Sequence, residues 1–189
     1  MEINTLSYPE TLSYNGPELR PHFILQKFSL RGSALVAFVG PCSVKTEHLV
    51  DWEDRLESET IEAAAMVHFL GEFFGLTLRE GVLFQRLLIA KACEVLCEMG
   101  IRAERRGNDI FCLGRKLSVS IVTASPVSVL FHFGVNIDPR GAPVAAVGLT
   151  ELGISTEVGV KDWANRILEA ANKEWAQVLW ACAKVRPVV

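Results

Sequence analysis

The 189-residue sequence lacks an apolar run long enough to cross a membrane. Its richest apolar run, residues 63–78, is interrupted by His68 and Glu72. Residues 1–14 lack the basic and apolar regions of a signal peptide, so we expect a cytoplasmic protein without a membrane partner. An excess of positive charge is also missing, because 19 Lys and Arg stand against 22 Asp and Glu. We therefore expect no nucleic-acid partner.

Cysteine is present five times, an odd number that does not suggest a disulfide framework. No spacing of cysteines and histidines matches a zinc site, so no metal is expected. The apolar fraction of 50% excludes disorder as the main state. The mean hydropathy of +0.26 is high for a solitary soluble monomer, which indicates a homodimer formed through a sheet edge or the tryptophan-bearing last helix.

Hydrophobic periodicity and turn residues predict an α+β fold, with a mixed, mostly antiparallel sheet flanked by helices. We expect one domain spanning residues 1–189, with residues 1–21 as an N-terminal arm or edge segment. The expected elements are, in chain order, strands at 23–30 and 34–39, helices from 58 to 75 and from 79 to 99, a hairpin of 109–113 with 116–124, a strand at 127–137, and a helix at 160–184.

The densest chemical signal lies around a predicted hairpin. Lys116 opens a strand directly after a tight turn, and Ser118 and Ser120 follow it at the period of two that places strand residues on one face. The hairpin returns Asn108 and Asp109 towards this lysine. One ammonium group surrounded by hydrogen-bonding groups on a sheet face predicts a receptor for an anion or a carboxylate.

At these residues the sequence resembles the biotin and lipoate protein ligase family. Members carry an Asn-Asp hairpin, then Gly-Lys/Arg-Lys-Leu, and later a strand with Gly-Ile-Asn. The matching residues here are Asn108-Asp109, Gly114-Arg115-Lys116-Leu117 and Gly134-Val135-Asn136. The match lies within residues 105–138, about a fifth of the chain. The whole chain also resembles a small, largely archaeal family of unknown function related to these ligases.

The resemblance implies a ligase-like fold and a site for a small carboxylic acid or its acyl-adenylate, with transfer of the acyl group to an acceptor protein. It implies that Lys116 is catalytic and stabilises charge on a mixed anhydride. The residues expected to bind substrate are Arg105, Arg106, Asn108, Asp109, Ser118, Ser120 and Asn136. The family's Arg- and Gly-rich nucleotide loop has no counterpart, since residues 40–45 lack the arginine. The resemblance therefore implies ATP as a cofactor, whereas the missing nucleotide loop argues against the use of ATP.

Each candidate also has a structural interpretation. Arg105 and Arg106 fit a solvated charge cluster, which we slightly prefer, and Lys116 alone could be an exposed hairpin lysine. His132 lies in an apolar strand, where a lone histidine is more often a hydrogen-bonded core residue. The alternative function is a catalytically inactive relative that binds a small anion or a partner protein.

A second group of titratable residues precedes the hairpin. His48, Asp51 and Asp54 recur at a spacing of three, and His68 and Glu72 share one face of the helix expected there. Such groups could bind a divalent metal or form an acid–base pair, but they match no established metal spacing. We favour a structural pair for His68 and Glu72, and keep both, with His132, as candidates to inspect.

Overall fold

The structure is a computed structural model, and it describes residues 3–188. Its main feature is a five-stranded sheet in the order β1-β2-β3-β8-β7. The strands are β1 (Asn4–Ser7), β2 (Ala34–Val44), β3 (Ile61–Phe73), β7 (Ser118–Ala124) and β8 (Val129–Asp138). β1 pairs with β2 in parallel, and every other neighbouring pair in this sheet is antiparallel. The predicted α+β class with a mostly antiparallel sheet is confirmed.

A smaller sheet contains the predicted hairpin. It consists of β4 (Glu104–Arg106), β5 (Asp109–Cys112) and β6 (Arg115–Lys116), all antiparallel. Leu113 and Gly114 turn the chain between β5 and β6 with φ angles of 52° and 72°, where glycine is favoured. The chain then passes through Leu117 into β7 of the large sheet. Lys116 therefore ends one sheet and Ser118 begins another, which interrupts the period-two relation expected between them.

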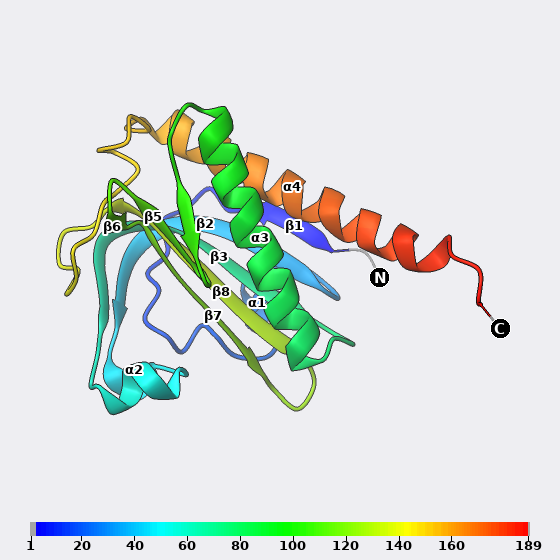
Figure 1. The fold of residues 1–189 in the computed structure, drawn as a ribbon. Helices are drawn as coiled ribbons and strands as arrows, with labels where there is room; N and C mark the ends of the chain where they lie inside the picture. The colour runs from blue at the N-terminus through cyan, green and yellow to red at the C-terminus, as the bar shows by residue number, and fades with distance from the viewer. Residues whose placement is uncertain (1–2, 189) are drawn as a thin grey trace.

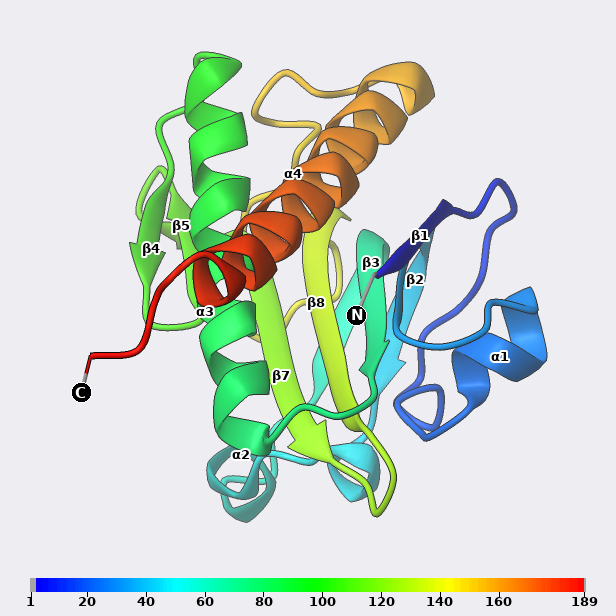
Figure 2. The ribbon, with the colours of Figure 1, turned by 90° about the vertical axis from the view of Figure 1, so that its right-hand side faces the viewer.

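Two long helices cover one face of the large sheet (Figures 1 and 2). They are α3 (Leu78–Glu98) and α4 (Glu157–Ala183), close to the predicted bounds. α3 begins with a capping box in which Thr77 and Glu80 bond reciprocally to each other's backbone N–H groups. Apolar side chains from the sheet and both helices form the core on this face, and Trp163 of α4 is fully buried in it. Trp180, near the end of α4, is 65% exposed.

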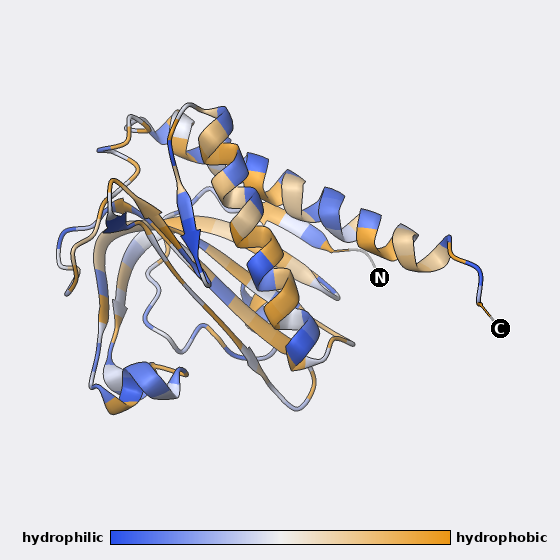
Figure 3. Ribbon diagram, viewed as in Figure 1, coloured by the Kyte–Doolittle hydropathy of each residue, from blue (hydrophilic) through white to orange (hydrophobic). Residues whose placement is uncertain are grey.

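The N-terminal part of the chain lies against the opposite face of the sheet. It includes α1 (Phe23–Phe28), while the connection from β2 to β3 carries the short helices η1 (Thr46–His48) and α2 (Trp52–Leu56). α2 is mainly hydrophilic, in contrast to the central strands of the large sheet (Figure 3). Tyr14 from the predicted arm is buried here in a second apolar cluster with Phe38 and Met66. The arm therefore contributes β1 to the sheet and covers part of this face.

Two predicted elements are wrong. The segment expected to be a helix from 58 to 75 is the long strand β3, and the strand expected at 23–30 is the helix α1. β3 lies between β2 and β8 with apolar side chains on both faces, so it lacks clear alternation and its apolar residues also fit a helical spacing. Residues 23–30 are rich in apolar residues that favour strands, but His22 turns the chain with φ of 63° directly before them.

None of the helices within residues 3–188 combines the length and the apolar content needed for a membrane span.

Candidate functional site

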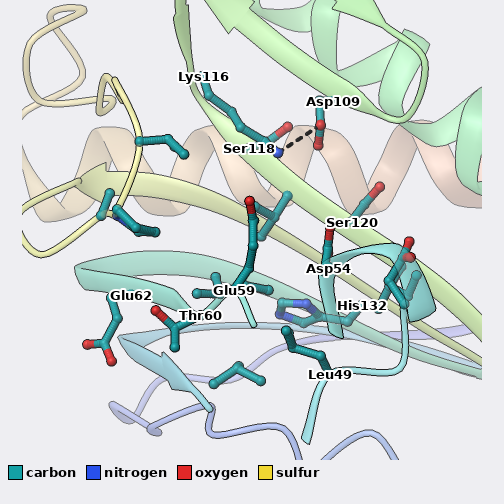
Figure 4. Close-up of a pocket in the computed structure, with 18 of the residues that line it drawn as sticks. Leu49, Asp54, Glu59, Thr60, Glu62, Asp109, Lys116, Ser118, Ser120 and His132 are labelled. Atoms are coloured by element: carbon teal, nitrogen blue, oxygen red, sulfur yellow. Dashed lines mark ion pairs between the residues drawn. The ribbon is translucent and has the colours of Figure 1, made fainter. Parts of the chain in front are cut away.

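A cavity of about 270 Å³ lies on the face of the large sheet opposite α3 and α4 (Figure 4). Its floor comes from β3, β7 and β8, with Met66, Ile121 and Asn136 among the lining residues. The segment from Val44 to Glu62, which includes η1 and α2, forms one wall, and residues 142–146 form another. The hairpin places Lys116 and Asp109 at its edge. The cavity is thus assembled from four separate parts of the chain.

Lys116 and Asp109 form an ion pair in which Nζ lies 2.9 Å from Oδ2. Both side chains are partly buried, with 31% and 21% exposed. The backbone of Lys116 is fixed on both sides, since its N–H donates to Ala145 and its carbonyl accepts from Val147. Burial raises the pKa of Asp109, and Lys116 opposes that shift. The pair is therefore held at a fixed position where an incoming anion could meet the ammonium group.

The remaining charges of the cavity are mostly negative. Lys116 is the single lysine or arginine among the described residues that line it. The acidic lining residues are Asp51, Glu53, Asp54, Glu59, Glu62 and Asp109. Desolvation raises the pKa of Asp54, the neighbouring carboxylates of Asp51 and Glu59 raise it further, and Lys116 lowers it. A bound anion would therefore meet attraction at one point only.

The predicted substrate-binding residues divide into those that border the cavity and those that do not. Asn108, Asp109, Ser118, Ser120 and Asn136 border it together with Lys116. Arg105 and Arg106 lie outside it, on the exposed strand β4.

The two arginines of β4 bond locally. Arg105 donates to the carbonyl of Gly107, and Arg106 pairs with Glu104 at 2.8 Å. The guanidinium of Arg106 also lies over the Phe111 ring, 4.6 Å from its centroid. These contacts fit a solvated charge cluster.

Several of the bordering polar groups are already used within the protein. The Ser118 hydroxyl accepts from the Ile110 N–H, and the Ser120 hydroxyl donates to the Asn108 carbonyl. The Asn108 amide donates to the Ser120 carbonyl, and the Asn136 amide donates to that of Val147. Ser118 and Ser120 therefore hold the hairpin against β7 and do not share a polar face with Lys116.

The second group of titratable residues is also divided. His48, Asp51 and Asp54 line the cavity, whereas His68 and Glu72 do not. The Glu72 carboxylate accepts from the His22 N–H at 2.9 Å and from the Ser128 hydroxyl at 2.7 Å, so it is a buried structural acceptor. The expected pairing of His68 with Glu72 is not formed. Among residues 3–188, no three His, Cys, Asp or Glu side chains are grouped as metal ligands would be.

His68 instead pairs with His132. Their rings lie on β3 and β8, with Nδ1 of His68 3.0 Å from Nε2 of His132. His132 lines the cavity, and the Tyr14 ring stacks on it with centroids 3.8 Å apart and planes 3° apart. No sequence motif marks Tyr14, Glu59 or Glu62 as lining residues, because the fold brings them in from distant segments.

Comparisons with known proteins agree with the fold. A protein of unknown function from Pyrococcus horikoshii is 38% identical, with full coverage of both chains and a TM-score of 0.92. A biotin protein ligase variant from Aquifex aeolicus in complex with biotin is 14% identical over 92% of this chain and 70% of its own, with a TM-score of 0.57. A lipoate-protein ligase A bound with ATP is 12% identical over 90% and 84%, with a TM-score of 0.56. At these identities the two ligases share the fold alone.

Family membership follows from the sequence comparisons. An uncharacterised protein from Methanocaldococcus jannaschii is 32% identical over 151 residues, which is 77% of this chain and 68% of that protein. Residues 3–186 match the family described as Domain of unknown function (DUF366), and the chain therefore belongs to this family.

Proposed function

We propose that the protein binds a small carboxylic acid with its carboxylate at Lys116 and activates it for transfer to an acceptor, as a distant relative of the biotin and lipoate ligases. The observation that carries this proposal is the Lys116–Asp109 pair at the edge of a cavity. The pair occupies the hairpin on which the resemblance to those ligases rests. The ligases of this fold include proteins with bound biotin and bound ATP.

The proposed chemistry has two steps. A carboxylate oxygen of the acid attacks the α-phosphorus of ATP, and pyrophosphate leaves with the electrons of the broken P–O bond. An amine of the acceptor then attacks the acyl carbon, releases AMP and loses a proton. Negative charge develops beside the acyl group in both steps. A fixed ammonium group at that point stabilises it more than water would, because it needs no reorganisation.

Size and charge are consistent with a small ligand carrying one anionic group. The cavity of about 270 Å³ is close to the lower end of the usual range for ligand pockets, which is roughly 300–1,000 Å³. Its single lysine or arginine, among the described lining residues, matches one carboxylate. The many acidic lining residues favour hydrogen-bond donors over further negative charge in the rest of the ligand.

The alternative is a binding module that uses the same cavity without ATP. One observation favours it: Lys116 is the one lysine or arginine that lines the cavity in the described part of the chain, while Arg105 and Arg106 bond locally on β4. A triphosphate is usually bound by several donors or by a metal ion. Such a module would bind a small acid or a partner protein and release no pyrophosphate.

Pyrophosphate release from ATP, measured with biotin, lipoate and octanoate, tests the proposal. Lys116→Ala should lower the rate by about 100-fold, the usual effect of removing one stabilising charge. Arg115→Ala is the matched control, because Arg115 pairs with Glu151 at 2.9 Å and does not line the cavity. Acid binding by calorimetry without pyrophosphate release would favour the module. No binding of any of these acids would exclude both forms of the acid-binding proposal.

A further inference from the structure

The buried pair of His68 and His132 carries information about the ligand of the cavity. His68 is fully buried and His132 is 2% exposed. Besides the contact between the two rings, Nε2 of His68 lies 3.2 Å from the carbonyl oxygen of Gly40. Gly40 precedes a bulge in β2, where the register against β3 shifts between Gly40 and Cys42. The three groups form one chain of hydrogen bonds across β2, β3 and β8.

The directions of these hydrogen bonds follow from elementary chemistry. A carbonyl oxygen only accepts, so Nε2 of His68 must carry the proton that it shares with Gly40. A neutral imidazole has one N–H, so Nδ1 of His68 is an acceptor. It therefore takes the proton of Nε2 of His132, and Nδ1 of His132 is left with a free lone pair. The Gly40 carbonyl thus fixes the tautomers of both rings.

Both rings are held in the neutral form. Burial lowers the pKa of His68 to about 4, and burial together with the neighbouring His68 lowers the pKa of His132 well below the ordinary value. The other titratable groups beside the pair are Tyr14, stacked on His132, and Cys42, just past Gly40 in β2; burial raises the pKa of both. These two groups are therefore neutral as well.

Nδ1 of His132 has no hydrogen-bond partner within residues 3–188, and the ring borders the cavity. Figure 4 shows the ring among the cavity residues, away from the Lys116–Asp109 pair. We infer that Nδ1 of His132 accepts a hydrogen bond from the ligand, and that the ligand is a carboxylic acid whose far end carries a neutral N–H or O–H donor. This inference rests on the proposed function, because Lys116 is taken to bind the carboxylate.

The inference separates two kinds of acid. An acid with a hydrocarbon or other donor-free end leaves the lone pair of His132 unmatched inside a buried site, which lowers affinity. An acid with a terminal donor satisfies it. The acidic lining residues act in the same direction, since ionised carboxylates accept hydrogen bonds and donate none. Specificity at this end of the cavity therefore comes from hydrogen-bond acceptors, of which Nδ1 of His132 is one.

Binding measurements with matched acids test this inference. The probes are hexanoate, octanoate and decanoate, each compared with the acid of the same length that carries a terminal hydroxyl. Calorimetry with the full chain should give about three- to tenfold tighter binding of the hydroxy acid at the best length, the usual effect of one neutral hydrogen bond. His132→Phe should remove this preference, and Lys116→Ala should weaken both acids equally.

Nitrogen NMR of the histidine side chains provides a second measurement on the wild-type protein, so the test does not depend on the folding of His132→Phe. It should report an unprotonated Nδ1 in both rings. The His132 Nδ1 signal should move with the hydroxy acid and not with its plain counterpart. Equal binding of both acids, or a protonated His132 Nδ1, would overturn the inference and leave the proposed function in place. Failure of every acid to bind would overturn both.

Discussion

Lys116 of β6 and Asp109 of β5 form an ion pair within one hairpin, with Nζ and Oδ2 2.9 Å apart. The contact has two opposite consequences for an acid that binds at Lys116. Asp109 orients the ammonium group at the edge of the cavity, and its carboxylate also competes with the carboxylate of the ligand. A substitution of Asp109 that removes its charge and keeps an oxygen that accepts from Lys116 can measure which of the two effects is larger.

Asp109→Asn keeps the size and the acceptor oxygen of the side chain and removes its charge. We expect octanoate to bind about threefold more tightly, because a like charge beside the ligand is lost while Lys116 remains hydrogen-bonded. Calorimetry at low ionic strength measures the change. Glu151→Gln is the control, since it removes a charge from the neighbouring ion pair with Arg115 outside the cavity. Weaker binding in Asp109→Asn would mean that orientation of Lys116 outweighs repulsion.

The histidine pair predicts that stability falls in mild acid. An unfolded chain takes up protons on His68 and His132 below the ordinary pKa of 6.5, whereas folded His68 remains neutral until about pH 4. The free energy of unfolding should therefore decrease as the pH falls from 6.5 towards 4. Urea unfolding at a series of pH values measures this slope.

A double variant isolates the contribution of the histidine pair. The double variant His68→Phe/His132→Phe should have a flatter slope over the same pH range, because neither ring can take up a proton after unfolding. Identical slopes in the wild type and the double variant would contradict neutral burial of the pair.

The carbonyl oxygen that fixes the histidine tautomers belongs to Gly40. A Cβ atom on this residue would lie 2.0 Å from the backbone oxygen of Leu12, which cannot move away as a flexible side chain could. Gly40→Ala should therefore lower the free energy of unfolding by about 2 kcal/mol or more. Gly134→Ala is the matched control on β8, where the closest contact is the Met66 methyl at 3.1 Å, and it should cost less. Chemical denaturation compares the two variants, and equal losses would contradict this account of Gly40.

The sequence was informative where the signal is local. The hairpin at Lys116 follows from its turn residues and from the resemblance, and the helix α3 follows from its apolar stripe. The sequence of β3 predicts a helix because its apolar residues are buried on both faces of the sheet. Such a strand lacks the alternation of apolar and polar residues, so periodicity does not distinguish a strand from a helix here. His68 and Glu72 were placed on one face under both interpretations, but only the sheet pairing determines their different partners.

The composition of the cavity was harder to predict. Tyr14 arrives from the N-terminal segment, Glu59 from the connection between β2 and β3, and Glu62 from the start of β3. None of them lies near the hairpin in sequence, so no motif could join them to Lys116. Ser118 and Ser120 lie close to Lys116 in sequence, but they belong to β7 of the large sheet, whereas Lys116 ends β6 of the small sheet. The break at Leu117 between these strands is not visible in the period-two spacing. The acidic character of the site is therefore a property of the fold.

Asp54 of α2 is one of the acidic residues that line the cavity. Burial and the carboxylates of Asp51 and Glu59 raise its pKa, so its charge is costly and easily removed. Asp54→Asn should tighten octanoate binding about two- to fivefold at low salt, with a smaller gain at high salt where the repulsion is screened. The wild type should approach the variant as the pH is lowered, since Asp54 is protonated at a higher pH than an ordinary aspartate. Glu57→Gln, which changes a charge on the same segment outside the cavity, should leave the affinity unchanged. A gain of the same size in both variants would assign the effect to net charge alone and not to the position of Asp54.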